Sequence, residues 1–191
     1  MKQIFYIHGA NETATCFNYI KATLPEHEAI DIDYDCHAPI IPTISKIIRN
    51  LAKTKDLEFI THSYGGIIAV AMGYYHNSVR KIVSLASPFG GSEGANYLRF
   101  FFPTYGLFKN VSSNNPLVQE IAKRGTIVPT LNIIATVGYN PFSAARNDGV
   151  ITIDSQRKLP GAKHVEVPFN HFEVLLSDPV VQMVKEFLWD K

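Results

Sequence analysis

Short apolar runs alternate with stretches of helical periodicity along this sequence. The apolar runs are bounded by polar or turn-forming residues, which is typical of strands buried on both faces. The predicted strands are Lys2–Ile7, Ala29–Tyr34, Leu57–Thr61, Lys81–Ala86, Leu131–Val137 and His164–Pro168. Strands that alternate with helices predict a parallel α/β sheet of about six strands with helices on both faces.

Between the strands, apolar residues recur at the spacing of one helix face. Ile67–Tyr75 is apolar almost all round, which predicts a buried helix. Asp178 is a suitable N-cap for the last helix, and Pro179 suits its first position. The predicted helices are Thr15–Leu24, Thr43–Lys53, Ile67–Tyr75 and a final helix that runs to about Trp189.

The segment between the fourth and fifth strands breaks this rhythm. The 42 residues from Pro88 to Pro129 are far more than one crossover helix needs. We therefore expect an insertion over one end of the sheet. Because the sequence shows no internal repeat or linker, we expect a single domain over residues 1–191, with a small cap at about 88–129.

Composition narrows the function classes. The chain has 191 residues, a net charge of +1, 18% charged residues and 12% aromatic residues. A near-neutral chain lacks the basic face of a nucleic-acid-binding protein. No apolar run is long enough to span a membrane, and Ile4–Ile7 is too short for a signal-peptide core, so we expect a cytoplasmic protein. Cys16 and Cys36 lack a Cys-x-x-Cys spacing, which predicts inert thiols.

The sharpest local motif is Thr61-His62-Ser63-Tyr64-Gly65-Gly66, which joins a predicted strand directly to an apolar helix. A serine on such a turn is held in a strained conformation with its hydroxyl exposed. Gly65 and Gly66 leave room for the helix to approach the strands. The helix N-terminus directs backbone N–H groups toward a developing oxyanion, and His62 is expected to pack under the turn.

With this motif and the residues that follow the other strands, the sequence resembles the α/β-hydrolase superfamily, most closely its minimal lipase- and esterase-like serine hydrolases. The resemblance covers the whole chain. His8-Gly9 matches the oxyanion loop, Asn147-Asp148-Gly149-Val150 the acid loop and Asn170-His171-Phe172 the histidine loop. The order Ser63, Asp148, His171 is the order of that fold. Thr61 departs from the pattern, because the family usually has glycine there.

The resemblance implies a catalytic triad of Ser63, His171 and Asp148, with an oxyanion hole formed by the backbone N–H groups of Tyr64 and Ala10. Two alternatives compete with this assignment. Asp154 follows Asp148 by six residues and could serve as the acid. His164 lies at the start of the same strand that His171 follows, which is the wrong end of the sheet.

No metal or cofactor is expected. The sequence has no His-Glu-x-x-His pair, and His171-Phe172-Glu173 lacks the Pro-Cys-x-x-Cys partner of a zinc deaminase. The Gly90-Gly91 pair lacks the Gly-Lys-Ser/Thr sequel of a phosphate loop.

The predicted cap holds six aromatic residues in twelve positions, between Tyr97 and Phe108. They could form a small core of the insertion, an apolar wall for an acyl chain, or a patch that makes transient contact with a lipid surface. Under the second interpretation the substrate-binding residues are Phe100, Phe101, Phe102 and Tyr105.

The sequence therefore predicts a serine hydrolase that cleaves esters with an apolar acyl chain through an acyl-enzyme. Its partner is a small acyl ester or a lipid, and not a nucleic acid. A thioesterase or acyltransferase would use the same triad, and a non-catalytic protein on the same fold could bind an apolar ligand.

Overall fold

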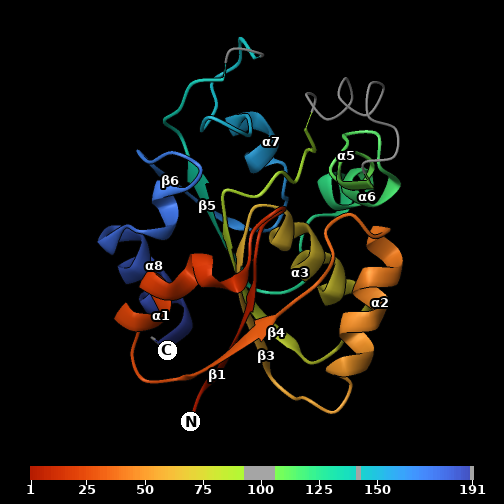
Figure 1. Cartoon of the computed structure of the whole chain (residues 1–191), viewed down its shortest axis with the longest axis vertical. Helices are drawn as coiled ribbons and strands as arrows, with labels where there is room; N and C mark the ends of the chain where they lie inside the picture. The colour runs from red at the N-terminus through yellow and green to blue at the C-terminus, as the bar shows by residue number, and fades with distance from the viewer. Residues whose placement is uncertain (93–105, 141–142, 190–191) are drawn as a thin grey trace.

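A six-stranded parallel sheet forms the centre of the molecule (Figure 1). The computed structural model describes residues 1–92, 106–140 and 143–189. The strand order is β2-β1-β3-β4-β5-β6, so the chain starts one strand in from an edge, adds β2 at that edge, and then proceeds strand by strand to the other edge. The strands are β1 (Gln3–Ile7), β2 (Glu28–Ile32), β3 (Leu57–His62), β4 (Val79–Leu85), β5 (Thr130–Ala135) and β6 (Lys163–Val167).

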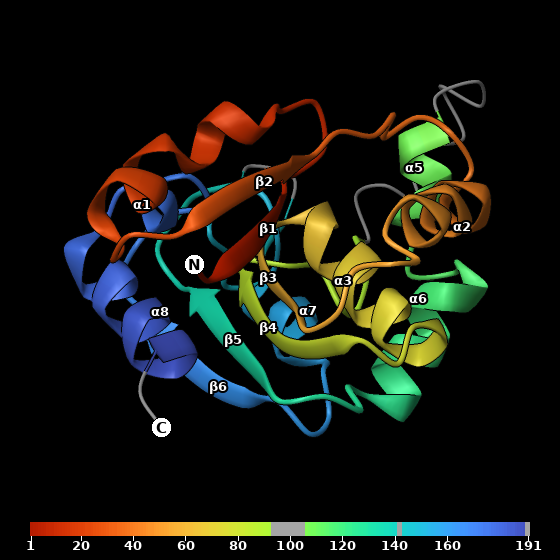
Figure 2. The same ribbon diagram turned by 90° about the horizontal axis from the view of Figure 1, so that it is seen from below.

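Helices cover both faces of this sheet (Figure 2). α1 (Asn18–Thr23) and α8 (Asp178–Trp189) lie on one face, and α2 (Ile40–Asn50), α3 (Tyr64–Tyr75) and α6 (Pro116–Arg124) lie on the other. Because successive side chains of a strand point to opposite faces, β1 serves both layers. Ile4 and Tyr6 join the core under α1 and α8, and Phe5 and Ile7 join the core under α2 and α3. The predicted fold class is confirmed.

Several element boundaries differ from those predicted. The predicted helix Thr15–Leu24 is divided into a 3₁₀ turn, η1 (Ala14–Phe17), and the short helix α1. α2 begins at Ile40, three residues before the predicted start. Pro42 lies in its first turn, where backbone N–H groups have no partner within the helix and a proline is tolerated.

α6 belongs to the helical layer on one face of the sheet. Its buried residues Leu117, Val118 and Ile121 share a hydrophobic core with α3. Three further short elements follow strands β4, β5 and β6: α5 (Gly106–Asn110), α7 (Ile153–Arg157) and η2 (Glu173–Leu175). The four predicted substrate-binding residues, Phe100, Phe101, Phe102 and Tyr105, lie outside the described residues.

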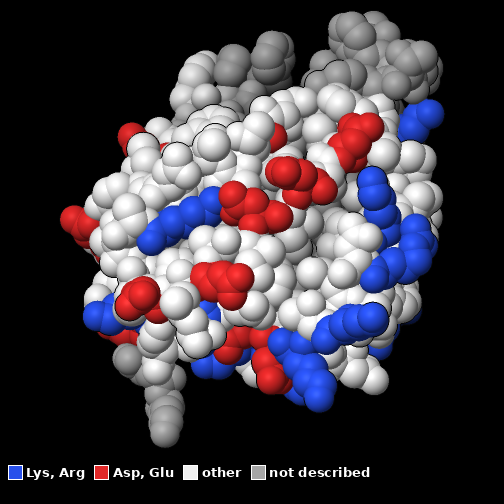
Figure 3. All heavy atoms as spheres, turned by 60° about the horizontal axis from the view of Figure 1, so that its bottom comes forward, with Lys and Arg blue, Asp and Glu red and all other residues white. Residues whose placement is uncertain are grey.

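Charge is spread over the surface. Figure 3 views the molecule from the side on which the strands begin, where acidic side chains lie across the middle and basic ones mainly along one side. Both edge strands carry exposed charged residues, which are Glu28 and Asp31 on β2 and Lys163 and Glu166 on β6.

Candidate active site

Three side chains from distant parts of the sequence meet at the carboxyl edge of the sheet. Ser63 follows β3, Asp148 lies in the loop after β5, and His171 lies in the loop after β6. Nε2 of His171 is 3.1 Å from Oγ of Ser63, and Nδ1 of His171 is 2.6 Å from Oδ2 of Asp148. Ser63 is partly exposed, whereas His171 and Asp148 are buried. The structure thus brings all three predicted residues together in one hydrogen-bonded chain.

Ser63 occupies a strained turn. Its φ is 50° and its ψ is −121°, a backbone conformation that non-glycine residues rarely adopt. The Ser63 N–H donates to the carbonyl oxygen of Leu85 at 2.9 Å, which fixes the turn to the end of β4. A Cβ on Gly65 would lie 2.2 Å from the carbonyl oxygen of Ile7, so only glycine allows α3 to start this close to β1.

The Asp148 carboxylate is surrounded by donors. Its Oδ1 accepts from the backbone N–H groups of Val150 at 2.9 Å and Ile151 at 2.6 Å. Its Oδ2 accepts from Nε2 of Gln156 at 3.1 Å, beside the contact with His171. An ionised carboxylate can only accept, so Nδ1 of His171 carries the hydrogen. Nε2 of His171 is then left as the acceptor that faces the Ser63 hydroxyl.

Of the two predicted oxyanion donors, Tyr64 directly follows Ser63, and Ala10 lies in a loop that approaches the start of α3. Tyr64 is the first residue of α3, where a backbone N–H has no partner within the helix. Ala10 lies in the loop after β1, the strand that pairs with β3. A Cβ on Gly65 would also lie 2.7 Å from the carbonyl oxygen of His8, so this loop passes close to the start of α3.

The competing residues lie elsewhere. Asp154 is in the first turn of α7 with a side chain 84% exposed, and its partner at 3.9 Å is Arg157. His164 lies at the beginning of β6, where its Nδ1 is 3.1 Å from Nδ2 of Asn132. Neither side chain is a partner of Ser63 or His171 in the described part of the chain.

A second carboxylate–imidazole pair, which the sequence did not reveal, lies beneath Ser63. Oε2 of Glu12 is 2.8 Å from Nδ1 of His62 and accepts the Gly9 N–H at 2.9 Å. Nε2 of His62 is 2.8 Å from the carbonyl oxygen of His171. His62 does pack under the turn, and its side chain is fully buried. The only hint of Glu12 in the sequence is an acidic residue a few positions after a strand end.

Burial acts on two further groups near Ser63. Burial alone would raise the pKa of Glu12, but the hydrogen bond and charge of His62, with the Gly9 N–H, hold this pKa below its usual value. Glu12 is therefore ionised at neutral pH. Burial raises the pKa of the Tyr64 phenol well above its usual value, so this side chain stays neutral.

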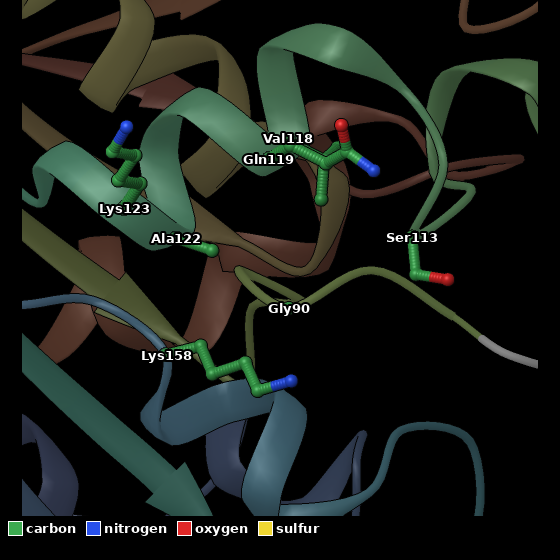
Figure 4. Close-up of a pocket in the computed structure, with 7 residues that line it drawn as sticks. All are labelled: Gly90, Ser113, Val118, Gln119, Ala122, Lys123 and Lys158. Carbon is green, nitrogen blue, oxygen red and sulfur yellow. The ribbon is translucent and has the colours of Figure 1, made fainter.

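A pocket of about 410 Å³ lies beside α6 and α7 (Figure 4). It is lined by Gly90, Ser113, Val118, Gln119, Ala122, Lys123 and Lys158, and contains none of the three hydrogen-bonded residues Ser63, His171 and Asp148.

Within residues 1–92, 106–140 and 143–189, no group of three or more His, Cys, Asp or Glu side chains is arranged to hold a metal ion. In the same ranges, no helix has the length and apolar character needed to cross a membrane.

Comparisons with known proteins identify the family and the fold. A model of the PGAP1-like alpha/beta domain matches residues 33–138, more than half of the chain. No curated protein matches the sequence. Among solved structures, the lipase BlEst2 of Bacillus licheniformis superposes with a TM-score of 0.69 at 17% identity, covering 96% of this chain and 91% of that one.

Two further structures are similar. Phospholipase PlaB from Legionella pneumophila has a TM-score of 0.76 at 11% identity, over all of this chain and 60% of its own. A metagenomic carboxyl esterase has a TM-score of 0.70 at 14% identity, over 96% of this chain and 73% of its own. At these identities the similarity shows the fold, which is that of lipase- and esterase-like α/β-hydrolases.

Proposed function

Because the chain belongs to the PGAP1-like alpha/beta domain family of α/β-hydrolases, we propose that it is a serine hydrolase that cleaves carboxylic esters with an apolar acyl chain. One observation carries the proposal. The Ser63 hydroxyl, on a strained turn, faces Nε2 of His171, whose Nδ1 is held by the buried Asp148 carboxylate. Nucleophile, base and orienting acid are the three roles that acyl transfer requires.

In the proposed reaction, Oγ of Ser63 attacks the ester carbonyl carbon while Nε2 of His171 takes the hydroxyl proton. The tetrahedral intermediate collapses, the carbon–oxygen bond to the alcohol breaks, and His171 returns the proton to the leaving alcohol. Water then attacks the acyl-enzyme by the same route and releases the acid. Asp148 keeps the proton on Nδ1 of His171 and stabilises the imidazolium formed in each step.

The negative oxygen of each tetrahedral intermediate is held by backbone N–H groups. In this proposal the donors are Tyr64, at the start of α3, and Ala10, in the loop after β1. Donors fixed by the backbone need no reorganisation as charge develops, so they favour the transition state over the bound ester.

Exposed apolar side chains in the loops around the site support an apolar substrate. Val137 and Tyr139 follow β5, and Phe172 follows His171 directly, with 52%, 84% and 55% of each residue exposed. The rings of Phe172 and His171 have centroids 5.2 Å apart. We also propose that residues 100–102 and 105 contact the acyl chain, in a cap of this single domain that is smaller than the predicted range 88–129, because α6 packs with α3 on a face of the sheet.

A fluorophosphonate probe tests the nucleophile, because it phosphonylates activated serines without requiring the natural ester. We expect the wild type to be labelled and Ser63→Ala to remain unlabelled. Ser78→Ala is the matched control, since Ser78 lies before β4 at the opposite end of the sheet. Equal labelling of wild type and Ser63→Ala would refute the serine-hydrolase mechanism.

A panel of p-nitrophenyl esters and matching thioesters tests the substrate class. We expect medium or longer acyl chains to be cleaved faster than acetate, with turnover lost in His171→Ala. A preference for acetyl esters would contradict an apolar acyl site. Faster cleavage of thioesters would make the protein a thioesterase, and tight binding of apolar ligands without turnover would make it a binding protein.

A further inference from the structure

Each ring nitrogen of His62 has an oxygen atom within hydrogen-bond distance. Its Nδ1 is 2.8 Å from a carboxylate oxygen of Glu12, and its Nε2 is 2.8 Å from the backbone carbonyl oxygen of His171. A carbonyl oxygen only accepts, so Nε2 must carry a hydrogen. The ionised Glu12 carboxylate also only accepts, so this second contact is a hydrogen bond only with a hydrogen on Nδ1. Both ring nitrogens of His62 therefore face acceptors, which is the arrangement of an imidazolium beside a carboxylate.

This ion pair joins three loops that the chemistry needs. The same Oε2 of Glu12 that meets His62 also accepts the Gly9 N–H at 2.9 Å, one residue before the proposed oxyanion donor Ala10. At the other end, His62 holds the backbone carbonyl of His171, whose backbone N–H donates to the Asp148 carbonyl oxygen at 2.9 Å. His62 itself precedes Ser63 directly.

Resting on the proposed function, we propose that Glu12 and His62 are positioning residues for the reaction. Their buried ion pair connects the oxyanion loop after β1 to the histidine loop after β6, and so sets the distance between the oxyanion donors and the general base. Neither residue touches the ester. His62 exchanges no proton during turnover, because both of its ring nitrogens are occupied by acceptors that hold them throughout.

The Glu12–His62 pair is shielded from solvent, as expected of residues that hold two loops in position. The His62 side chain is fully buried and that of Glu12 is 15% exposed, so water contributes little to either charge. Removing one partner of a buried pair leaves the other charge without compensation. The histidine rings of positions 62 and 171 have centroids 4.8 Å apart, so a shift of one is transmitted to the other.

The kinetic test compares Glu12→Gln with the wild type. Glutamine can keep the shape and one acceptor oxygen but removes the charge that holds the second proton on His62. We expect kcat to fall by about 10- to 100-fold with KM nearly unchanged, because misplaced groups affect the transition state more than the bound ester. Glu26→Gln, an exposed change of the same kind in the loop before β2, should leave kcat unchanged.

The spectroscopic test needs no substrate. In protein labelled with ¹⁵N at the histidine ring nitrogens, we expect both nitrogens of His62 to carry protons at pH 7, and one of these protons to be lost in Glu12→Gln. The His62 signals are assigned by their disappearance in His62→Gln, or by elimination with variants of the other six histidines if His62→Gln does not fold.

The two tests separate this proposal from the proposed function. A singly protonated His62 in the wild type, or an unchanged kcat in Glu12→Gln, would refute the positioning role of Glu12 and His62 without affecting the proposed esterase activity. If the wild type is neither labelled by the fluorophosphonate nor active on esters, the proposed function fails. A Glu12-dependent doubly protonated His62 would then still establish the ion pair and its link between the loops.

Discussion

Two carboxylate–histidine pairs lie near Ser63, and they differ in what the second ring nitrogen meets. In the Asp148–His171 pair, Nε2 faces a serine hydroxyl, which can give up a proton. In the Glu12–His62 pair, Nε2 faces a backbone carbonyl, which cannot. The first pair can therefore cycle between neutral and charged imidazole, whereas in our proposal the second is a fixed ion pair.

A carboxylate next to a histidine does not by itself identify a proton shuttle. The deciding contact is on the far side of the ring. A partner that can both donate and accept leaves the histidine free to act as a base, while a partner that only accepts turns the same side chain into a structural tie. Four predictions probe these two pairs and their surroundings, from the largest expected effect to the smallest.

Asp148→Asn should lower kcat by about 10³- to 10⁴-fold. An asparagine that directs its amide toward Nδ1 of His171 would favour the tautomer with the hydrogen on Nε2, which cannot accept the Ser63 proton. The measurement is kcat on the best p-nitrophenyl ester. Asp154→Asn is the control and should match the wild type, because Asp154 is exposed on α7. A loss in Asp154→Asn instead would reassign the acid.

Gly65→Ala should destabilise the fold by about 3 kcal/mol or more, since its Cβ would lie 2.2 Å from the Ile7 carbonyl oxygen at the base of the loop that carries Glu12. Gly73→Ala in the same helix is the matched control. Its Cβ would lie 3.7 Å from Val128, and alanine favours a helix by about 1 kcal/mol over glycine. Chemical denaturation measures both, and equal effects would contradict tight packing at the turn.

The stability that Glu12 provides should depend on pH. Burial alone would raise the pKa of Glu12, but His62 and the Gly9 N–H lower it overall, so the folded state favours the ionised form. Such a group stabilises the fold above its unfolded pKa, and this contribution is lost as the pH falls through its folded pKa.

The difference in Tm between the wild type and Glu12→Gln should therefore be constant near neutral pH and shrink below about pH 4.5, the ordinary carboxyl value. We expect a difference of a few degrees at pH 7. Thermal unfolding followed by circular dichroism from pH 3 to pH 8 would measure it. A difference that grows on acidification would mean that Glu12 is buried in its neutral form.

The thiol next to Glu12 gives the smallest effect. Burial raises the pKa of Cys16 to about 12, and the Glu12 charge adds to the shift. Iodoacetamide should therefore alkylate Cys16 slowly at pH 8 in the folded protein, since the thiolate is the reactive form. Glu12→Gln should increase this rate modestly, as read by mass spectrometry of the Cys16 peptide. A rate equal to that of a free thiol would show that neither burial nor the Glu12 charge raises the pKa of Cys16.

The strands were predictable because strands of a parallel sheet are buried on both faces and read as apolar runs. The residues at which helices begin were harder to predict from the sequence. α3 begins at Tyr64 and not at Ile67, because Gly65 and Gly66 permit a close approach to β1 and β4 that no local pattern encodes.

The residues that meet at Ser63 were predictable as far as strand ends specify them. Ser63, Asp148 and His171 each follow a strand, and parallel strands bring such loops to one edge. Glu12 and Gln156 could not be found in this way. Their roles depend on the direction of a side chain in a loop and on a short helix, and neither hydrophobic periodicity nor motif spacing determines that direction.

The outer strands bear on how the protein behaves at high concentration. The outer edge of a sheet presents unpaired backbone groups that can pair with a strand from another molecule. Here β2 carries Glu28 and Asp31 and β6 carries Lys163 and Glu166, all exposed. A foreign strand would have to strip water from these charges in order to pair. Resistance to edge-to-edge aggregation is thus built into the two strands farthest from the middle of the sheet.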